Sequence, residues 1–504
     1  MKLLHNIRKP IEISENEIFS EVIKKYGLSA TEEISVYKES VDCRHGKISK
    51  VYTLAIETDR EHPDFADIPE YKFEAEIKNK NLKVVIVGMG PSGLFCAKTL
   101  SDFGVMPIII DRGSPVEERI KDVENLWSKG ILKPESNVQF GEGGAGTFSD
   151  GKLTCRKNDP RSRKILSDFV SYGAPENIEK EALPHIGTDF LRKTVINMRN
   201  DLIKKGVKFI YNACFTDIET DANGKVTAIK TSKGTVPCDV LVLALGNGSF
   251  DTFSMLMNRN VAFETKPMSF GVRQEHFQTD INRAIYGNAA GNPLLPQASY
   301  SFYTHLDKET CVYSFCMCPG GKVVNSSSIP DRLTTNGMSD FSRDGKNANA
   351  ALLVSFTPQT VASALEFQKA IEEKAFSAAG GAFPVSAKLS KKSSDTTVVP
   401  TILPTYEFAD FTKIFPPYFI SSLEKGSDIF HKKIFGSTPF ERPIFTAPET
   451  RTSSPLRLKR DKETLKSLSH ENIYPCGEGA GYAGGIMSSA IDGIKIAEKI
   501  LTSY

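Results

Sequence analysis

Apolar and polar positions recur with different periods along the chain, and these periods predict its first elements. Residues 15–27 carry apolar side chains at helical spacing and end at Gly27, which suits a helix C-cap. Residues 33–43 and 49–58 alternate in the manner of strands. We therefore expect a small α+β domain over residues 1–80, and nothing in it indicates chemistry.

The segment after this domain has the pattern of a βαβ unit. Residues 82–87 form a continuous apolar run, as expected for a parallel strand that is buried on both faces. Residues 94–103 have helical spacing, and residues 105–110 form a second apolar run. The sequence thus predicts a strand, a helix and a parallel strand, with a glycine-rich turn before the helix.

That turn reads GMGPSG, a G-x-G-x-x-G motif. Gly88 permits the tight turn, Gly90 lets the backbone approach a pyrophosphate, and Gly93 lets helix and strand pack closely. The helix N-terminus adds unpaired N–H groups and the positive end of a dipole. Asp111, at the end of the second strand, can accept hydrogen bonds from ribose hydroxyls. For Arg112 two interpretations stay open, contact with an adenosine or exposure to solvent. The residues predicted to line this dinucleotide site are Gly88, Gly90, Pro91, Ser92, Gly93, Asp111 and Arg112.

The remaining chain alternates between regular segments and long loops. Residues 189–206 predict a helix, and residues 207–246 predict several strands. Residues from about 250 to 440 mix strands with loops and predict a second domain. Residues 473–498 return to a strand, a glycine-rich loop and a helix.

This C-terminal segment resembles the second flavin motif of FAD proteins of the glutathione-reductase type. In that group a strand ending in Gly-Asp or Gly-Glu lies by the ribityl and pyrophosphate part, and the next helix points its N-terminus at the flavin. The strand that ends at 243–246 resembles a third element of the group, a small-residue turn beside the cofactor. The resemblance implies FAD as cofactor, in contact with Ala244, Gly246, Gly477, Glu478, Gly485 and Ile486.

A closer resemblance covers most of the chain after residue 80. The segments that carry it are FGEGGAGTFSDGKL (140–153), FGVRQEH (270–276), SFCMCPGG (314–321), residues 336–354 and PETRTSSPLR (448–457). They are similar to the bacterial family catalogued as uncharacterised FAD-dependent dehydrogenases, a group of NAD(P)/FAD-dependent oxidoreductases. One departure is Gln274, where the family has an aliphatic residue.

The glycines of residues 140–153 would let the backbone pack against a flat ring. We expect Gly143, Gly144 and Gly146 to do so, while Thr147, Ser149 and Lys152 hydrogen-bond the cofactor or a substrate. A lysine beside a flavin would tune its potential electrostatically. The alternative is a flexible surface loop.

Cys316 and Cys318 form a C-x-C pair for which two interpretations stay open. The first is a redox pair beside the flavin. The second is two ordinary strand cysteines before a Pro-Gly-Gly turn. On a regular strand both side chains point the same way, which is a poor geometry for a relaxed disulfide.

Arginines supply the candidate contacts for an anionic substrate. Arg451 lies in a polar cluster with Thr452, Ser453 and Arg457, and Arg273 belongs to the 270–276 segment. Bidentate binding of an anion by these arginines and interdomain salt bridges are both open interpretations. His276 and His305 are candidate acid–base groups, although structural roles are more common for histidine.

The composition bears on partners and location. Lys plus Arg number 63 and Asp plus Glu 61, so the net charge of +2 gives no footprint for nucleic acid or an anionic membrane. No apolar run is long enough for a bilayer, and no signal-peptide pattern is present. Nine cysteines without framework spacing indicate a reduced, cytoplasmic protein. No zinc-like spacing occurs, so we expect no metal.

We expect an α/β fold with a discontinuous Rossmann-like FAD-binding domain over residues 81–262 and 441–504. A mixed, strand-rich substrate or cap domain, residues 263–440, is inserted in it, and the N-terminal domain of residues 1–80 precedes it.

The resemblance implies an FAD-dependent oxidoreductase that moves hydride through flavin N5 to or from a small, anionic metabolite. No further G-x-G-x-x-G motif indicates a separate NAD(P)H domain, so NAD(P)H would bind only transiently as electron donor or be replaced by another donor. The alternatives are a non-catalytic FAD-binding scaffold and a flavin enzyme that modifies RNA.

Overall fold

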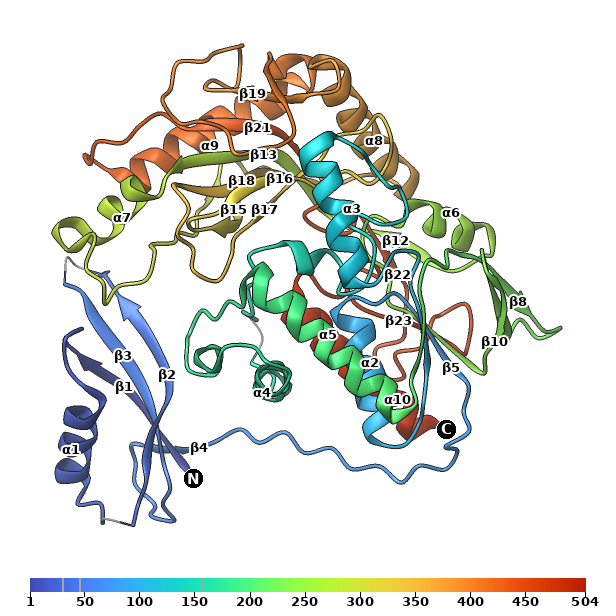
Figure 1. The fold of residues 1–504 in the computed structure, drawn as a ribbon, viewed down its shortest axis with the longest axis horizontal. Coiled ribbons are helices and arrows are strands. Elements are labelled where there is room, and N and C mark those ends of the chain that lie inside the picture. The colour runs from blue at the N-terminus through green and yellow to red at the C-terminus, as the bar shows by residue number, and fades with distance from the viewer. Residues whose placement is uncertain (30, 45–46, 156–157) are drawn as a thin grey trace.

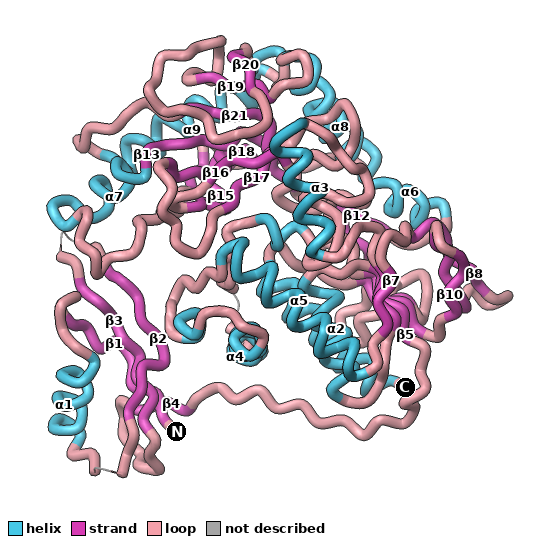
Figure 2. Tube along the Cα trace, viewed as in Figure 1, coloured by secondary structure: helices cyan, strands magenta, loops and turns pink. Residues whose placement is uncertain are grey.

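The computed structural model describes residues 1–29, 31–44, 47–155 and 158–504. Three parts are visible in Figure 1: a small N-terminal domain, a central domain with a parallel sheet, and a cap with a large mixed sheet. A long extended segment connects the N-terminal domain to the first strand of the central sheet, as the loop colour in Figure 2 shows.

The N-terminal domain is a four-stranded sheet with one helix, of which the sequence predicts the helix and the two strands β2 and β3. Ser14 and Glu17 form a capping box at the start of the helix, and Gly27 ends it with a left-handed backbone. On the edge strand β2, the Glu39 amide donates to the carbonyl oxygen of Lys180 at 2.7 Å. The domain therefore docks on the central domain through a sheet edge. Its elements are β1 (Lys2–Lys9), α1 (Glu15–Tyr26), β2 (Ile34–Asp42), β3 (Ser49–Ile56) and β4 (Phe65–Asp67).

The central domain is built on a five-stranded parallel sheet with the order β23-β11-β5-β6-β7. In β5, Val84 and Ile86 pack into the core under α2 and α10, whereas Val85 and Val87 pack into the core on the opposite face. Both faces are thus covered, which explains the continuous apolar run in the sequence. The domain contains β5 (Val84–Val87), α2 (Pro91–Asp102), β6 (Ile108–Ile110), α3 (Val116–Lys129), α4 (Arg161–Ser171), α5 (Gly187–Lys205), β7 (Lys208–Ile210), β8 (Phe215–Thr220), β9 (Val226–Thr231), β10 (Gly234–Pro237), β11 (Val240–Leu243), α6 (Phe250–Asn258), β23 (Ile473–Pro475) and α10 (Ile486–Ser503).

The cap is a seven-stranded sheet with the order β14-β15-β18-β13-β21-β19-β20, flanked by helices. A two-stranded ribbon, β12 (Phe263–Thr265) with β22 (Leu456–Leu458), lies where the chain passes between the two domains. The cap elements are β13 (Met268–Phe277), α7 (Gln278–Tyr286), β14 (Tyr303–His305), β15 (Cys311–Cys318), β16 (Lys322–Asn325), β17 (Thr335–Met338), β18 (Asn347–Phe356), α8 (Val361–Ala378), β19 (Phe383–Ser386), β20 (Tyr406–Phe408), α9 (Pro417–Phe435) and β21 (Ile444–Glu449).

One domain boundary differs from the sequence expectation. The chain was expected to return to the central domain at residue 441, but β21 pairs with β13 and β19 and belongs to the cap sheet. Every residue of β21 is buried, as in a parallel strand that is covered on both faces. The hydrophobic pattern of such a strand therefore does not show whether it belongs to the cap sheet or to the central parallel sheet.

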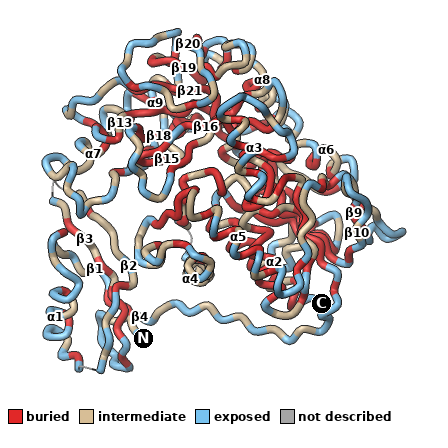
Figure 3. Tube along the Cα trace, viewed as in Figure 1, coloured by how far each residue is buried: buried red, intermediate tan, exposed pale blue. Residues whose placement is uncertain are grey.

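Buried residues concentrate along the central sheet and under the cap sheet, with a smaller cluster in the N-terminal domain (Figure 3). Among the helices that the structure describes, none combines the length and the apolar character needed to cross a bilayer.

Candidate functional site

Three adjacent parallel strands end at the same edge of the central sheet, and each is followed by a small-residue loop. Val87 of β5 pairs with Leu243 of β11, which in turn pairs with Pro475 of β23. The carboxyl ends of these strands therefore bring the three sequence motifs together. Such an edge is where open α/β sheets bind ligands.

Two glycines of the G-x-G-x-x-G turn are required by packing. A Cβ on Gly88 would lie 2.2 Å from the carbonyl oxygen of Ala244, and one on Gly93 would lie 1.9 Å from that of Gly88. Gly90 differs, because the nearest atom to a Cβ there, the Cα of Gly144, is 3.8 Å away. Gly90 also precedes the first turn of α2, whose N-terminal N–H groups face the same loop.

Asp111 and Arg112 hold the other end of this turn. The Asp111 carboxylate accepts from the amides of Met89 (2.9 Å) and Gly113 (2.8 Å). Arg112 lies 4.5 Å from the ring centre of Phe140 and donates to Asp251 at 2.7 Å. The guanidinium is thus stacked and paired, with 12% of the side chain exposed, so the solvated interpretation is wrong.

The 140–153 segment lies against the turn rather than on the surface. The Gly143 amide donates to the Met89 carbonyl oxygen at 2.8 Å. A Cβ on Gly144 would come within 3.0 Å of the Gly90 Cα, and one on Gly146 within 3.0 Å of Ile486. The segment therefore packs on both the first turn and the start of α10, and its glycines permit these approaches.

Three further glycines have no packing reason to be glycine. A Cβ on Gly246, Gly484 or Gly485 would meet no atom within 4 Å, and none of the three has a left-handed backbone. All three line a cavity of about 1850 Å³. Open glycines from two separate loops, one after β11 and one before α10, fit a flat ligand that lies against backbone.

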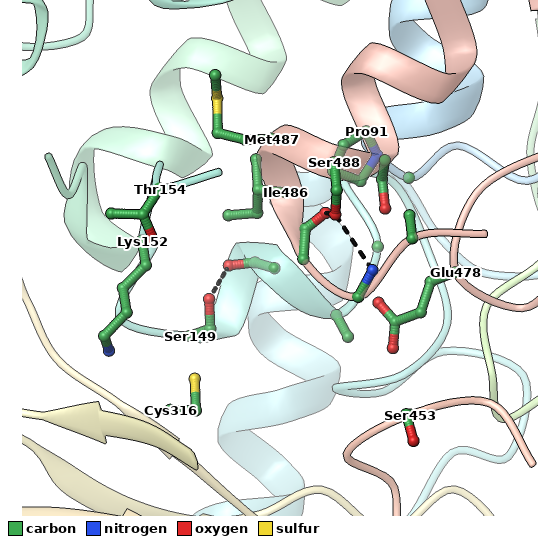
Figure 4. A pocket seen from close by; sticks show the side chains of 18 of the residues that line it. Pro91, Ser149, Lys152, Thr154, Cys316, Ser453, Glu478, Ile486, Met487 and Ser488 are labelled. Carbon is green, nitrogen blue, oxygen red and sulfur yellow. Dashed lines mark hydrogen bonds between the residues drawn. The ribbon is translucent and has the colours of Figure 1, made fainter. Parts of the chain in front are cut away.

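This cavity continues from the sheet edge to the underside of the cap sheet. Figure 4 shows Lys152 reaching from the 140–153 segment toward the strand that carries Cys316, whose sulfur points back into the cavity. The predicted residues that line it are Gly88, Gly90, Pro91, Ser92, Asp111, Arg112, Gly144, Gly146, Ser149, Lys152, Ala244, Gly246, Cys316, Arg451, Thr452, Ser453, Arg457, Glu478, Gly485 and Ile486. Those that do not are Gly93, Gly143, Thr147, Arg273, Gln274, His276, His305, Cys318 and Gly477.

Thr147 and Gly477 hold the loops from behind. Thr147 is fully buried and accepts at its carbonyl oxygen from Thr188 at 2.6 Å. Gly477 has a left-handed backbone, and a Cβ there would lie 2.5 Å from the Ser92 hydroxyl. Its neighbour Glu478 faces the cavity and accepts from Asn247 at 2.9 Å. Burial raises the pKa of Glu478 to about 7 against the opposing charge of Lys266.

Positive charge exceeds negative charge around Asp150. This buried carboxylate accepts from Arg343 at 2.7 Å and lies 2.9 Å from Lys152 Nζ. Burial alone would raise the pKa of Asp150, but the two cations lower it. Two cations share one carboxylate here, so a net positive charge borders the cavity.

The arginines expected to bind an anionic substrate are all engaged with carboxylates. Arg273 is fully buried and pairs with Glu449 at 2.7 and 3.1 Å. Arg451 forms a bidentate pair with Glu372 of α8, both distances being 2.9 Å, and Arg457 donates to Glu264 at 3.0 Å. These pairs favour salt bridges over anion binding, but the Arg273–Glu449 pair joins neighbouring strands of the cap sheet and not two domains.

The C-x-C pair departs from a regular strand. Between Phe315 and Cys318 the register of β15 against β18 shifts by one residue, and Cys316 has φ 46°. Cys316 lines the cavity, whereas Cys318 is fully buried. The expectation that both side chains share one face rested on an extended strand and is wrong because of this β-bulge.

The histidine candidates lie away from the cavity. His276 is buried among aromatic rings and contacts His431 (3.2 Å between Nε2 atoms), and burial holds the pKa of His276 well below its ordinary value. His305 contacts Tyr303 on the exposed strand β14. Gln274 is buried and donates to the hydroxyl of Tyr300, a cavity residue, at 3.3 Å.

Arg119 shapes the site and was missed from the sequence. Its fully buried guanidinium donates to the carbonyl oxygens of five loop residues, Asn137, Val138, Gly141, Glu142 and Gly144. In the sequence it is one charged residue in an amphipathic helix, where exposure is the ordinary expectation. Only the apolar-stripe position next to Val116 and Val123 could have indicated burial.

Two comparisons relate the chain to known protein sequences. The cap, residues 267–452, matches the family described as FAD-dependent protein, C-terminal domain-like. An uncharacterized protein of Clostridium beijerinckii is 38% identical over 530 residues, which cover 99% of this chain and 98% of that protein. The chain belongs to the same family as that protein. The match runs through the N-terminal domain as well as the central domain and the cap.

The chain is also similar, at low sequence identity, to several solved structures. L-proline dehydrogenase from P. horikoshii has a TM-score of 0.38 and 9% identity, over 83% of this chain and 93% of that one. Glycine oxidase from Bacillus cereus has a TM-score of 0.31 and 12% identity, over 83% and 95%. The structure of CtdE in complex with FAD has a TM-score of 0.32 and 11% identity, over 83% of both chains.

Proposed function

We propose that the protein is an FAD-dependent oxidoreductase that transfers hydride to or from a small metabolite. The observation that carries the proposal is the meeting of three small-residue loops, after β5, β11 and β23, on one cavity of about 1850 Å³. The family description of the cap, FAD-dependent protein, supports the same cofactor.

The residues present fit an extended dinucleotide. Asp111 would take the ribose, the amides at the start of α2 would take the pyrophosphate, and Glu478 would face the ribityl chain. The open glycines Gly246 and Gly485 would lie against the flat parts. The start of α10, at Ile486, brings a positive dipole end to the flavin.

FAD supplies hydride acceptance and donation at flavin N5, and the chain supplies position and charge. The surplus positive charge at Lys152 and Arg343 would stabilise negative charge that develops in the cavity. Residues of the cap sheet line this part of the cavity. A protonated Glu478, favoured by burial at pH values below about 7, can donate a hydrogen bond that a carboxylate cannot.

The cavity leaves room for a second ligand. Its volume of about 1850 Å³ exceeds the ~300–1,000 Å³ of ordinary small-molecule sites. The part under the cap is lined by aromatic residues, namely Tyr300, Phe302, Tyr303, Tyr313 and Phe315. Such a chamber suits a small, largely apolar or unsaturated substrate, or a nicotinamide that visits transiently. The anionic substrate expected from Arg273, Arg451 and Arg457 is not carried into this proposal, because each of these arginines pairs with a carboxylate.

A large side chain introduced into the cavity tests whether FAD binds there. Gly246→Phe should preserve folding, because nothing lies within 4 Å of the Cβ position, and should abolish FAD uptake. Ala222→Phe, in an exposed turn, is the matched control and should bind FAD normally. Absorbance after reconstitution reports binding, and circular dichroism reports folding. Equal FAD affinity in both variants would refute the proposed site.

A second measurement tests catalysis. The FAD-loaded protein is titrated anaerobically with NADH and NADPH, and flavin absorbance is followed. Bleaching supports a reductase that accepts nicotinamide electrons. Flavin that neither nicotinamide nor a panel of small oxidisable metabolites can bleach would favour the FAD-binding scaffold instead.

A further inference from the structure

Cys316 and Cys318 lie at the end of β15, in a backbone conformation that neighbouring residues hold in place. The bulge places two residues of β15 opposite one of β18. Cys316 has a left-handed backbone conformation, which residues other than glycine rarely adopt. Such strain persists only where the surroundings enforce it, and it is common at functional sites. Cys316 faces the cavity, whereas Cys318 has no exposed surface and its Sγ donates to the Cys316 carbonyl oxygen at 3.3 Å.

Arg273 enforces this conformation. Its Nη1 donates to the Cys316 carbonyl oxygen at 3.1 Å and to Asn349 at 2.9 Å, while Glu449 holds the other face of the guanidinium. A Cβ on Gly337 would lie 2.2 Å from Arg273 Nη1, so glycine is needed there for the arginine to fit. A fully buried ion pair thus fixes one cysteine backbone at the cavity wall.

The surroundings favour a thiolate at Cys316. Lys152 Nζ is buried and lies 2.9 Å from Asp150 Oδ2, and among the described residues it makes no hydrogen bond. Lys152 thus pairs with Asp150 while it lines the cavity. A hydrogen bond from the Cys318 thiol, followed by the charges of Lys152 and Arg273, lowers the pKa of Cys316 to about 6. The same contact raises the pKa of Cys318, which keeps its proton.

We propose that Cys316 and Cys318 form a redox-active dithiol that exchanges an electron pair with the flavin in this cavity. The proposal rests on the proposed function, since FAD is the oxidant. The Cys316 thiolate and the Cys318 thiol form an S–S bond as the Cys318 S–H bond breaks. The electron pair and that proton pass to FAD, which becomes FADH⁻. Charge and atoms balance, and the reverse reaction reduces the disulfide.

One experiment tests the thiol pair without FAD. The apoprotein is alkylated with iodoacetamide from about pH 5 to pH 9, and each cysteine is quantified by peptide mass spectrometry. Cys316 should react at a much lower pH than Cys311, a cysteine of the same strand whose pKa burial raises. Lys152→Met should slow Cys316 alkylation near pH 6.5 by about threefold, because raising a pKa of about 6 by one unit lowers the thiolate fraction at this pH from about three quarters to about one quarter. A Cys316 that titrates with Cys311 would overturn the proposal.

A second experiment tests exchange with the flavin. The protein is oxidised with diamide, loaded with FAD, and its flavin is photoreduced anaerobically. Two new thiols per flavin should appear in wild type and in Cys311→Ser, and none in Cys316→Ser, Cys318→Ser or FAD-free protein. If FAD is not taken up, the proposal falls together with the proposed function. If FAD is bound and reduced while the wild-type thiol count stays constant, this proposal alone is overturned.

Discussion

The guanidinium of Arg119 donates a hydrogen bond from Nη1 to the carbonyl oxygen of Gly144 at 2.9 Å. Through this bond a residue of α3 holds the very glycine that packs against Gly90 in the dinucleotide turn. Burial lowers the pKa of Arg119 to about 10, so the group stays charged at neutral pH. The buried guanidinium of Arg119 therefore holds the 140–153 segment in place.

Replacing Arg119 by lysine should destabilise the protein and weaken FAD binding together. Lysine keeps the charge but has three donors for the five carbonyls that the guanidinium serves. We expect a loss of about 2–4 kcal/mol in the free energy of unfolding, measured by urea denaturation, because each orphaned buried acceptor costs ~1–3 kcal/mol. Arg283→Lys, at a side chain that is 54% exposed, is the control and should change stability by less than about 0.5 kcal/mol. Equal effects of the two substitutions would contradict this role.

Alanine at two glycines of the same motif should have opposite consequences. Gly93→Ala places a methyl 1.9 Å from a carbonyl oxygen, and we expect a loss of about 3 kcal/mol in stability. Gly90→Ala has 3.8 Å of space and should lose less than about 1 kcal/mol.

The Gly90 methyl would nevertheless stand between the backbone and a pyrophosphate. FAD affinity of Gly90→Ala should fall at least about tenfold, the equivalent of ~1.4 kcal/mol. Thermal denaturation and FAD titration separate the two effects. A Gly90→Ala protein that binds FAD as well as wild type would place the pyrophosphate elsewhere.

The parts of the site that follow strands could be predicted, because short-range rules govern them. The buried run before Gly88 and the close approaches at Gly88 and Gly93 each have one local explanation, and the structure agrees with it. Gly27 and Gly206 end helices with left-handed backbones for the same kind of reason. Parallel strands then bring separate motifs to one edge without further information.

The parts that depend on distant partners could not be predicted. The carboxylates that pair with Arg273 and Arg451 are 176 and 79 residues away in the sequence. The bulge at Cys316 depends on Arg273, and a C-x-C pattern does not indicate it. Charged residues are ordinarily exposed, so a buried pair is visible only once its partner is placed.

Removing one partner of the Arg451–Glu372 pair should destabilise the folded protein rather than impair catalysis directly. The two side chains are 2% and 0% exposed, so Arg451→Met leaves Glu372 as an uncompensated buried charge. We expect a loss of about 3–5 kcal/mol in stability. The double variant with Glu372→Met should recover much of this loss, as urea denaturation of the full cycle would show. If Arg451→Met leaves stability unchanged but raises KM, the interpretation in which Arg451 binds the substrate would be the correct one.

Glu478 should make stability depend on pH in a direction opposite to that of a salt-bridged carboxylate. Burial raises the pKa of Glu478 to about 7 in the folded protein, from 4.5 as the ordinary value. Between these pH values the folded state holds a proton that the unfolded state has released, so the contribution of this group to stability is full below about pH 4.5 and is lost as pH rises through 7.

Glu478→Gln, which mimics the protonated form, should remove that part of the dependence. The free energy of unfolding of the variant, measured by urea denaturation of FAD-free protein, should therefore rise relative to wild type between about pH 4.5 and 7 and stay constant above. Asn247 donates to Glu478 at 2.9 Å, so Asn247→Ala is the companion variant that removes a neighbour without removing the carboxyl, and it should keep the wild-type slope. A difference between Glu478→Gln and wild type that does not change with pH would mean that this carboxyl stays ionised in the folded protein, and the hydrogen-bond donor assigned to it would then be absent at neutral pH.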